Sequence, residues 1–142
     1  MVHALGNGVG DRPCRVHTSD LRIYVEEAGL ATFPDASVIC GPLQQHEASP
    51  IPTALNPAIL VEVTSDSSED YDAGSKREYY QTIPTLREYV IVSHRLRRIT
   101  VHARAAGGGW DTRVAIRAGE VEIASLEVQL KVDEIFRNSS VQ

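Results

Sequence analysis

Residues 58–64 read Ala-Ile-Leu-Val-Glu-Val-Thr, a run that is apolar at nearly every position apart from Glu62. Such a run predicts a central β-strand that is covered on both faces. A carboxylate buried there without a partner would cost several kcal/mol, so Glu62 requires a metal ion, a neighbouring cation or a raised pKa. We therefore expect Glu62 to bind a metal ion or, alternatively, to form a structural ion pair.

The segment after this strand, residues 65–83, is predicted to form one helix. Ser67 or Ser68 can cap its N-terminus, and Pro84 closes it. Gly74 weakens the middle of this helix by about 1 kcal/mol relative to alanine. The sequence therefore predicts one main helix directly after the central strand.

Three polar side chains share one face of the predicted helix, because Asp72, Lys76 and Tyr80 are spaced four residues apart. On the strand, Glu62 and Thr64 share a face because side chains alternate between the two sides of a sheet. If the helix packs back across the sheet, Lys76 can reach the Glu62 carboxylate. Asp72, Tyr80 and Thr64 are then accessory candidates.

The remaining chain is rich in predicted strands. The strand candidates are residues 14–25, with an irregularity near 18–19, then 33–40, 86–93, 98–104 and 110–116, with shorter pieces at 121–123 and 126–130. Residues 41–57 are predicted to be a loop, and 132–136 a helical turn. Strands, one helix and more strands indicate an α+β fold with a mixed, largely antiparallel sheet.

A second acidic residue has the right setting to join Glu62. Asp35 follows Pro34 at the start of a predicted strand. Mg²⁺ takes one or two carboxylates from a protein and its other ligands from waters and a substrate phosphate. Asp35, Glu62 and Lys76 therefore predict phosphodiester hydrolysis, in which Lys76 orients the attacking water or offsets developing charge. Alternatively, Asp35 is only a turn residue and Lys76 is only a solvated lysine of the helix. Asp20 is a further candidate for an accessory residue of the site.

Composition narrows the class of protein. A chain of 142 residues with 42% hydrophobic residues fits one globular domain, and it has no apolar run long enough for a membrane span and no secretory signal. We expect a cytoplasmic protein with no membrane partner.

Cys14 and Cys40 lack zinc-site spacing and are expected to be buried free thiols in a reducing compartment. His46 and His94 are interpreted as surface histidines.

The net charge of −5 argues against a polyanionic partner, but the bases are unevenly distributed. Residues 94–117 contain six arginines against a single acid, Asp111. This stretch predicts a surface that contacts DNA or, alternatively, a solvated basic face. The candidate DNA-binding residues are Arg95, Arg97, Arg98 and Arg104.

Four stretches carry a family resemblance. In chain order they are residues 33–41 (FPDASVICG), 56–65 (NPAILVEVTS), 71–76 (YDAGSK) with Tyr80, and 86–90 (LREYV). Together they resemble the Uma2 family, also called DUF820, of the PD-(D/E)xK nuclease superfamily. The resemblance implies a restriction-endonuclease-like core over about residues 14–136, with Asp35, Glu62 and the backbone carbonyl of Val63 as metal ligands. Thr64 stands where the superfamily pattern has lysine, and Lys76 on the following helix is the implied replacement.

Members of this family usually begin with a further N-terminal stretch that includes a helix covering the sheet. Residues 1–13 carry three glycines and are predicted to be mobile, 14–136 to form a single nuclease-like domain, and 137–142 to be a C-terminal tail. The sheet is therefore expected to be partly uncovered, which favours a homodimer. The sequence predicts an endonuclease that uses Mg²⁺ or Mn²⁺ to hydrolyse DNA; the alternative is an inactive interaction or DNA-binding module on the same fold.

Overall fold

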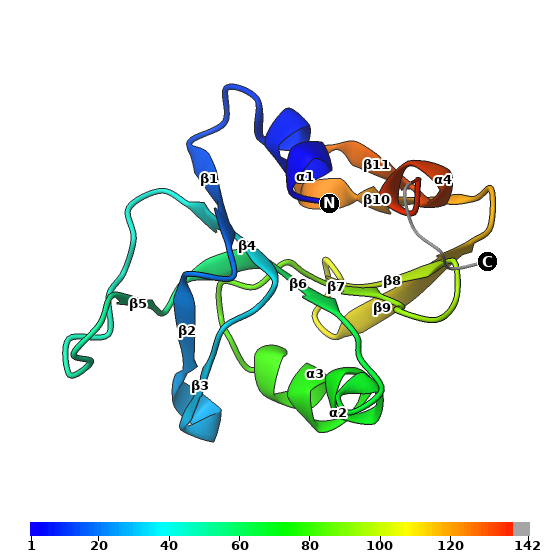
Figure 1. Ribbon diagram of the computed structural model, residues 1–142. Coiled ribbons are helices and arrows are strands. Elements are labelled where there is room, and N and C mark those ends of the chain that lie inside the picture. The colour runs from blue at the N-terminus through cyan, green and yellow to red at the C-terminus, as the bar shows by residue number, and fades with distance from the viewer. Residues whose placement is uncertain (138–142) are drawn as a thin grey trace.

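The computed structural model describes residues 1–137, so the predicted tail at 137–142 lies outside the described residues except for Arg137. A six-stranded sheet forms the centre of the molecule, in the order β1-β4-β6-β7-β8-β9 (Figure 1). Its strands are β1 (Cys14–Thr18), β4 (Ala36–Cys40), β6 (Pro57–Val63), β7 (Glu88–Val92), β8 (Arg98–Arg104) and β9 (Trp110–Ile116).

The predicted apolar strand is β6, which lies between β4 and β7 in this sheet. It pairs antiparallel with β4 and parallel with β7, and every other pairing in the sheet is antiparallel. The parallel pair requires a crossover, and the helical segment after β6 supplies it. The predicted α+β class with a mixed, largely antiparallel sheet is confirmed.

One face of the sheet is covered by the two ends of the chain. Helices α1 (Val2–Val9) and α4 (Val132–Ile135) pack there with the hairpin of β10 (Glu120–Ile123) and β11 (Val128–Lys131), in which η2 (Ala124–Leu126) is the connection (Figure 1). Leu5 is fully buried and Val9 is 8% exposed. Residues 2–9, predicted to belong to a mobile segment, therefore form a helix whose Leu5 and Val9 pack into the core, and the prediction of an uncovered sheet is wrong.

The second face of the sheet is covered by α2 (Glu69–Ala73), α3 (Ser75–Tyr80) and a small three-stranded sheet. The small sheet has the order β3-β2-β5, with β2 (Arg22–Val25), β3 (Leu30–Thr32) and β5 (Thr53–Ala54); η1 (Glu26–Ala28) joins β2 to β3. Residues 14–25 thus form two strands in different sheets rather than one irregular strand. Tyr80, Tyr89, Leu60 and Leu86 fill the core on this side.

The helix predicted over residues 65–83 is interrupted. It forms two short helices, α2 and α3, that meet at Gly74. A Cβ atom at Gly74 would lie 2.9 Å from the carbonyl oxygen of Asp70, closer than side chains pack. The chain bends here because glycine permits this approach.

The two cysteines are joined. Cys14 and Cys40 are paired residues of β1 and β4, and a disulfide links them. The prediction of buried free thiols is wrong, because the antiparallel register places the two side chains next to each other. The argument for a reducing compartment, which rested on free thiols, falls away with it.

None of the helices within residues 1–137 is long and apolar enough to cross a membrane.

Candidate functional site

The carboxylate of Glu62 is buried near the C-terminal end of β6 and forms an ion pair with Lys76 of α3. The Nζ atom of Lys76 lies 2.5 Å from Oε2 of Glu62, and the two side chains are 13% and 6% exposed. The contact expected from the spacing on strand and helix is therefore present. This ion pair explains how a single acid can be buried in an apolar strand, because a buried cation matches its negative charge.

Two further side chains of the helical segment hold this pair in place. The hydroxyl of Tyr80 donates a hydrogen bond of 2.7 Å to the same Oε2 atom, and its oxygen lies 3.3 Å from Oγ1 of Thr32. Oδ1 of Asp72 lies 3.5 Å from Nζ of Lys76. Asp72 is 2% exposed, so Lys76 is enclosed between two buried carboxylates.

A second layer of contacts fixes Asp72. Ser68 donates a hydrogen bond of 2.8 Å from Oγ to Oδ2 of Asp72, and the Tyr89 hydroxyl donates to the backbone carbonyl of Asp72 at 2.9 Å. Ser68 was predicted only as a helix cap; it is the N-cap residue of α2, but its hydroxyl bonds to Asp72 instead of to a backbone N–H of the helix. The spacing of four residues between Ser68 and Asp72 was the available signal.

Burial and charge act against each other on the ion pair. Burial raises the pKa of Glu62, and the hydrogen bonds from Lys76 and Tyr80 offset part of that rise. Burial acts to lower the pKa of Lys76, but the carboxylates of Glu62 and Asp72 outweigh it and raise the pKa above its ordinary value. Lys76 is therefore held in its charged form. Burial also raises the pKa of Tyr80, so its hydroxyl remains a donor to Glu62.

Asp35 lies at the edge of this site. In the β4–β6 register Ala36 pairs with Val61, so the next position along both strands sets Asp35 opposite Glu62. Oδ2 of Asp35 accepts a hydrogen bond of 2.7 Å from the backbone N–H of Val63. The structure thus brings Asp35, Glu62 and Val63 to the same end of β6, where Asp35 is exposed and Val63 is 46% exposed.

The donor set fits a hard divalent cation. Oε2 of Glu62 is taken by Lys76 and Tyr80, and Oδ2 of Asp35 by the N–H of Val63, so within residues 1–137 the second oxygen of each carboxylate has no hydrogen bond. Mg²⁺ needs only one or two carboxylates, because it keeps waters and takes substrate phosphates as ligands. Residues 1–137 contain no cluster of three or more His, Cys, Asp or Glu side chains arranged to hold a metal by themselves. A cation here would therefore depend on water and phosphate oxygens for its remaining ligands.

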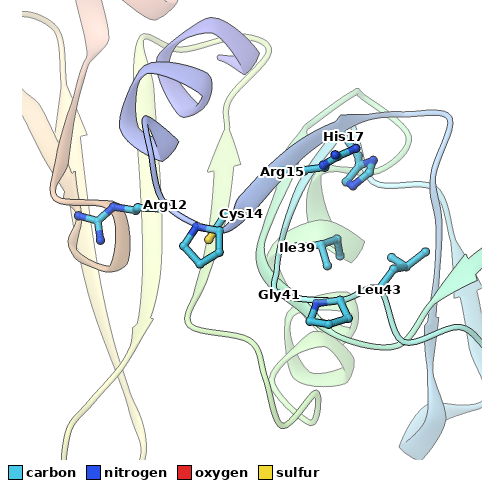
Figure 2. A pocket seen from close by; sticks show the side chains of 9 residues that line it. Arg12, Cys14, Arg15, His17, Ile39, Gly41 and Leu43 are labelled. Carbon is cyan, nitrogen blue, oxygen red and sulfur yellow. The ribbon is translucent and has the colours of Figure 1, made fainter.

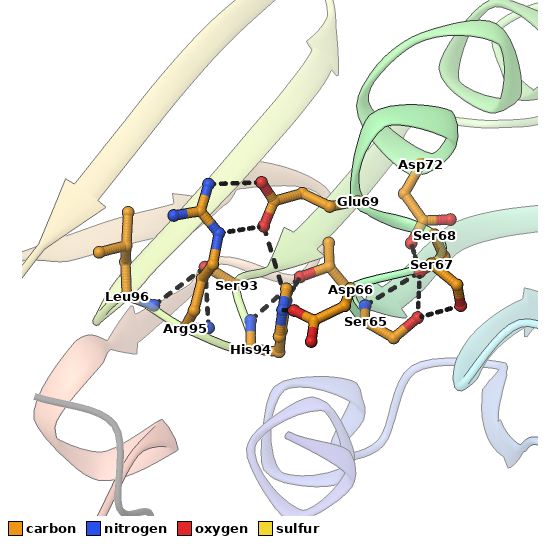
Figure 3. Close-up of polar contacts among 11 residues, drawn as sticks. Ser65, Asp66, Ser67, Ser68, Glu69, Asp72, Ser93, His94, Arg95 and Leu96 are labelled. Atoms are coloured by element: carbon orange, nitrogen blue, oxygen red, sulfur yellow. Dashed lines mark hydrogen bonds and ion pairs between the residues drawn. The ribbon is translucent and has the colours of Figure 1, made fainter.

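Thr64, directly after the end of β6, belongs to a second polar network that the sequence did not predict and that includes His94 and Asp66 (Figure 3). Oγ1 of Thr64 lies 2.6 Å from Nδ1 of His94, and Nε2 of His94 lies 2.7 Å from Oδ1 of Asp66. The side chain of His94 is 22% exposed. The interpretation of His94 as a surface histidine is therefore wrong: β6 and β7 run parallel, so the residues that follow both strands meet at one edge of the sheet.

The four candidate arginines do not form one surface. Arg95 makes two hydrogen bonds to Glu69, from Nε at 2.7 Å and from Nη2 at 2.5 Å, and these bonds lower the pKa of the Glu69 carboxyl (Figure 3). Arg98 instead lines a cavity between α2, α3 and the sheet. Arg95 is therefore already paired, whereas Arg98 faces an open space.

The other two arginines have structural contacts. Arg97 forms an ion pair of 3.3 Å with Asp133 of α4. Arg104 lies over the ring of Trp110, 4.5 Å from its centroid, and donates to two backbone carbonyls in the connection before β7. Binding of DNA by Arg95, Arg97 and Arg104 thus stays a prediction. Each of these arginines would have to keep or give up its present contacts in order to bind DNA.

Two further places lie apart from the Glu62 site. Asp20 is exposed in the turn between β1 and β2, and within the described chain it forms no hydrogen bond or ion pair with Glu62, Lys76 or Asp72. A cavity of about 600 Å³ opens beside Cys14, as Figure 2 shows. Its lining consists of Arg12, Pro13, Cys14, Arg15, His17, Ile39, Gly41, Pro42 and Leu43, none of which is acidic.

Comparison with known proteins finds relatives and a solved structure that are similar to this chain. The uncharacterized protein slr1290 of Synechocystis sp. is 32% identical over 124 residues, which cover 87% of this chain and 64% of that protein. A second Synechocystis protein, sll1609, is 26% identical over 121 residues, 84% of this chain and 68% of its own length. The chain thus spans about two thirds of the length of these relatives.

A solved structure shares the fold. The crystal structure of a "putative nuclease belonging to DUF820" from Anabaena variabilis has a TM-score of 0.71 at 17% identity, covering 96% of this chain and 75% of that one. The model of the Uma2 family, described as "Putative restriction endonuclease", matches residues 2–133. Since this match includes every strand, from β1 to β11, the chain belongs to the Uma2 family.

Proposed function

We propose that this chain is a metal-dependent endonuclease that hydrolyses phosphodiester bonds in DNA. Its membership of the Uma2 family supports a nuclease-like function. The single observation that carries the finer proposal is the buried ion pair between Lys76 and Glu62, beside Asp35 at the end of the central strand. A buried lysine paired with a buried acid is expensive to maintain, and phosphodiester chemistry gives both of them, and the exposed Asp35 beside them, a task.

Lys76 supplies a fixed positive charge at this centre. Its ammonium is enclosed between Glu62 and Asp72, so it does not need to reorganise when negative charge develops on a phosphate oxygen. Tyr80 and Ser68 orient the two carboxylates that position Lys76. These side chains therefore set the place of the cation before substrate arrives.

Asp35, Glu62 and the carbonyl of Val63 would hold Mg²⁺ or Mn²⁺. When bound, such an ion polarises the scissile phosphate and lowers the pKa of a coordinated water. Glu62 contributes its free oxygen while its other oxygen stays with Lys76 and Tyr80. Asp35 is exposed, so it lies on the side that solvent and a phosphate can approach.

The direct test is plasmid nicking with and without Mg²⁺. Wild type is compared with Asp35→Asn, Glu62→Gln and Lys76→Met, and with Asp111→Asn as a control for the loss of an exposed acid on β9. We expect nicking by wild type and by the control, and a loss of about a hundredfold or more in the three site variants. Equal activity in all five proteins contradicts the proposal.

A second candidate function is a catalytically inactive interaction or DNA-binding module. It is favoured by Thr64, which stands in place of the superfamily lysine and is bonded to His94 rather than open to substrate. Calorimetry with Mn²⁺ separates the two functions: the nuclease gives saturable heat that Glu62→Gln abolishes, and the inactive module gives none.

A homodimer belongs to the same proposal, because cutting both strands of a duplex takes two sites. Strand β9 is a free edge of the six-stranded sheet, and its Val114 and Ile116 are both 55% exposed. An exposed apolar edge favours pairing with a second copy. A single species with the mass of one chain in sedimentation at micromolar concentration would contradict this assembly.

A cytoplasmic location stays a prediction, and the disulfide between Cys14 and Cys40 counts against it. Because thiols are kept reduced there, this location predicts that Cys14 and Cys40 are found reduced when freshly lysed cells are treated with an alkylating reagent. Recovery of the disulfide-bonded form from such a lysate would argue against a cytoplasmic location.

A further inference from the structure

A cavity of about 210 Å³ lies between the helical segment and the sheet, on the same sheet face as Glu62. Asp72 and Lys76 face Glu62, whereas Ala73 and Arg77, each one position later on the helices, line this cavity. Its full lining is Thr64, Glu69, Ala73, Arg77, Ile91, Ser93, Arg98, Thr100 and His102. Neighbouring residues of the helical segment therefore face the Glu62 site and the cavity, and Thr64, directly after β6, lines the cavity.

The charge of this cavity is positive. Arg77 and Arg98 are half-buried in its wall, and neither takes part in the ion pairs formed within residues 1–137. Nε of Arg77 donates to the carbonyl of Ala73 at 3.1 Å, which leaves its terminal nitrogens for a ligand. The one acid in the wall, Glu69, is neutralised by the two hydrogen bonds from Arg95. The guanidinium groups of Arg77 and Arg98 thus remain without a direct ion pair within residues 1–137, although the charge of Arg98 also acts on the nearby Glu69 carboxylate.

The neutral groups of the wall are hydrogen-bond donors. Oγ of Ser93 accepts the backbone N–H groups of Arg95 and Leu96, at 3.4 and 3.1 Å, so its own proton is free to point elsewhere. Thr100 adds a half-buried hydroxyl. Nδ1 of His102 lies 2.9 Å from Oγ1 of Thr112, which leaves Nε2 as the unused ring nitrogen. Hydroxyl groups and guanidinium forks together are the donor set that phosphate oxygens require.

We propose that this cavity binds a phosphate group. Its position beside the Glu62 site favours a backbone phosphate of the nucleic acid next to the one that is cut, because Thr64 lines the cavity and directly follows Val63. This choice of source rests on the proposed function, whereas the affinity of the cavity for phosphate does not. The alternative source of the same group is a free phosphate or a nucleoside monophosphate.

Binding is measured without any divalent metal, so that neither cleavage nor the Glu62 site contributes. Inorganic phosphate is titrated by calorimetry in EDTA into wild type, Arg98→Gln, Arg77→Gln and Thr100→Val. The matched control is Arg113→Gln: Arg113 lies on β9 opposite Val101, on the other face of the sheet, and is exposed like a typical surface arginine. We expect saturable binding by wild type and control, and binding weakened about tenfold or more in each arginine variant.

Thr100→Val protects the test against misfolding, because it removes one hydroxyl and keeps the shape of the side chain. It is expected to weaken phosphate binding with an unchanged unfolding midpoint. No saturable phosphate binding by wild type, or equal binding by wild type and all four variants, overturns the proposal.

A second titration identifies the source of the phosphate. Binding of a short DNA duplex in EDTA is followed over a range of salt concentrations. If the cavity holds a backbone phosphate, Arg98→Gln lowers the slope of log K against log salt by about 1, and Arg113→Gln does not. If Arg98→Gln abolishes binding of inorganic phosphate but leaves this slope unchanged, the ligand is a free phosphate or a mononucleotide. Failure of plasmid nicking affects neither result.

Discussion

The Nζ atom of Lys76 lies 2.5 Å from Oε2 of Glu62, and both groups are almost completely buried. Neither charge is stable there alone, because an unpaired buried ion costs several kcal/mol. The pair therefore ties the helical segment to the central strand, and its two members have unequal and non-additive effects on stability.

Replacing Lys76 by methionine leaves the Glu62 carboxylate buried without its cation. We expect Lys76→Met to lower the free energy of unfolding by about 3 to 5 kcal/mol, as measured by urea denaturation. Glu62→Gln combined with Lys76→Met removes the uncompensated charge and is expected to recover part of this loss. Lys131→Met is the matched control, since Lys131 is exposed and is the other lysine of the chain. Additive effects in the double variant would contradict a coupled pair.

Gly74 provides a second prediction, about the bend between α2 and α3. Gly74→Ala is expected to destabilise the protein by about 1 to 3 kcal/mol, because the added Cβ would meet the Asp70 carbonyl at 2.9 Å. Gly6→Ala is the matched control: nothing lies within 4 Å of a Cβ at this position of α1, so alanine should stabilise the helix by about 1 kcal/mol. Thermal unfolding of both variants measures the difference, and a stabilising Gly74→Ala would exclude a tight bend.

The disulfide between Cys14 and Cys40 leads to a third prediction. The two residues are 26 apart in sequence, and the loss of loop entropy in the unfolded chain is worth about 3 kcal/mol for a loop of this length. Replacing both cysteines by serine should therefore lower the melting temperature by roughly 10 °C. A thiol assay on the unfolded, unreduced protein should detect no free thiol, and two free thiols would contradict the bond.

The core of the site could be predicted from the sequence because its signals are local. The apolar run around Glu62 is characteristic of a buried strand, and the spacing of Asp72, Lys76 and Tyr80 sets them on one side of a helix. Burial then leaves few partners for a lone acid. These constraints act within about twenty residues, so one sequence contains enough information to identify the partners.

The features that escaped prediction depend on contacts between distant segments. Leu5 is buried because α1 packs not only on the neighbouring β1 but also on η2 and β11, more than a hundred residues later, and the nearby glycines suggested mobility instead. Cys14 and Cys40 meet only because β1 and β4 pair in one register. Thr64 and His94 meet only because β6 and β7 run parallel. Local pattern carries no information about register or strand order, so these contacts required the structure.

The last prediction concerns His102, whose ring is buried between β8 and the helical segment. Burial and, after it, the charge of Arg77 lower the pKa of His102 below the 6.5 of an exposed histidine. Above pH 6.5 the ring is neutral in both the folded and the unfolded chain, so it adds no pH dependence. Below pH 6.5 the unfolded chain binds a proton that the folded chain rejects, so the free energy of unfolding should fall as the pH decreases towards the lower folded-state pKa.

Urea denaturation between about pH 7 and about pH 5 should show this slope in wild type and a smaller slope in His102→Gln. Part of the slope should remain in that variant, because burial and Arg15 also lower the pKa of His17; His17→Gln in the same background should remove that part additively, since the two histidines lie on separate strands. An identical slope in wild type and His102→Gln would show that His102 is protonated equally in the folded and the unfolded chain.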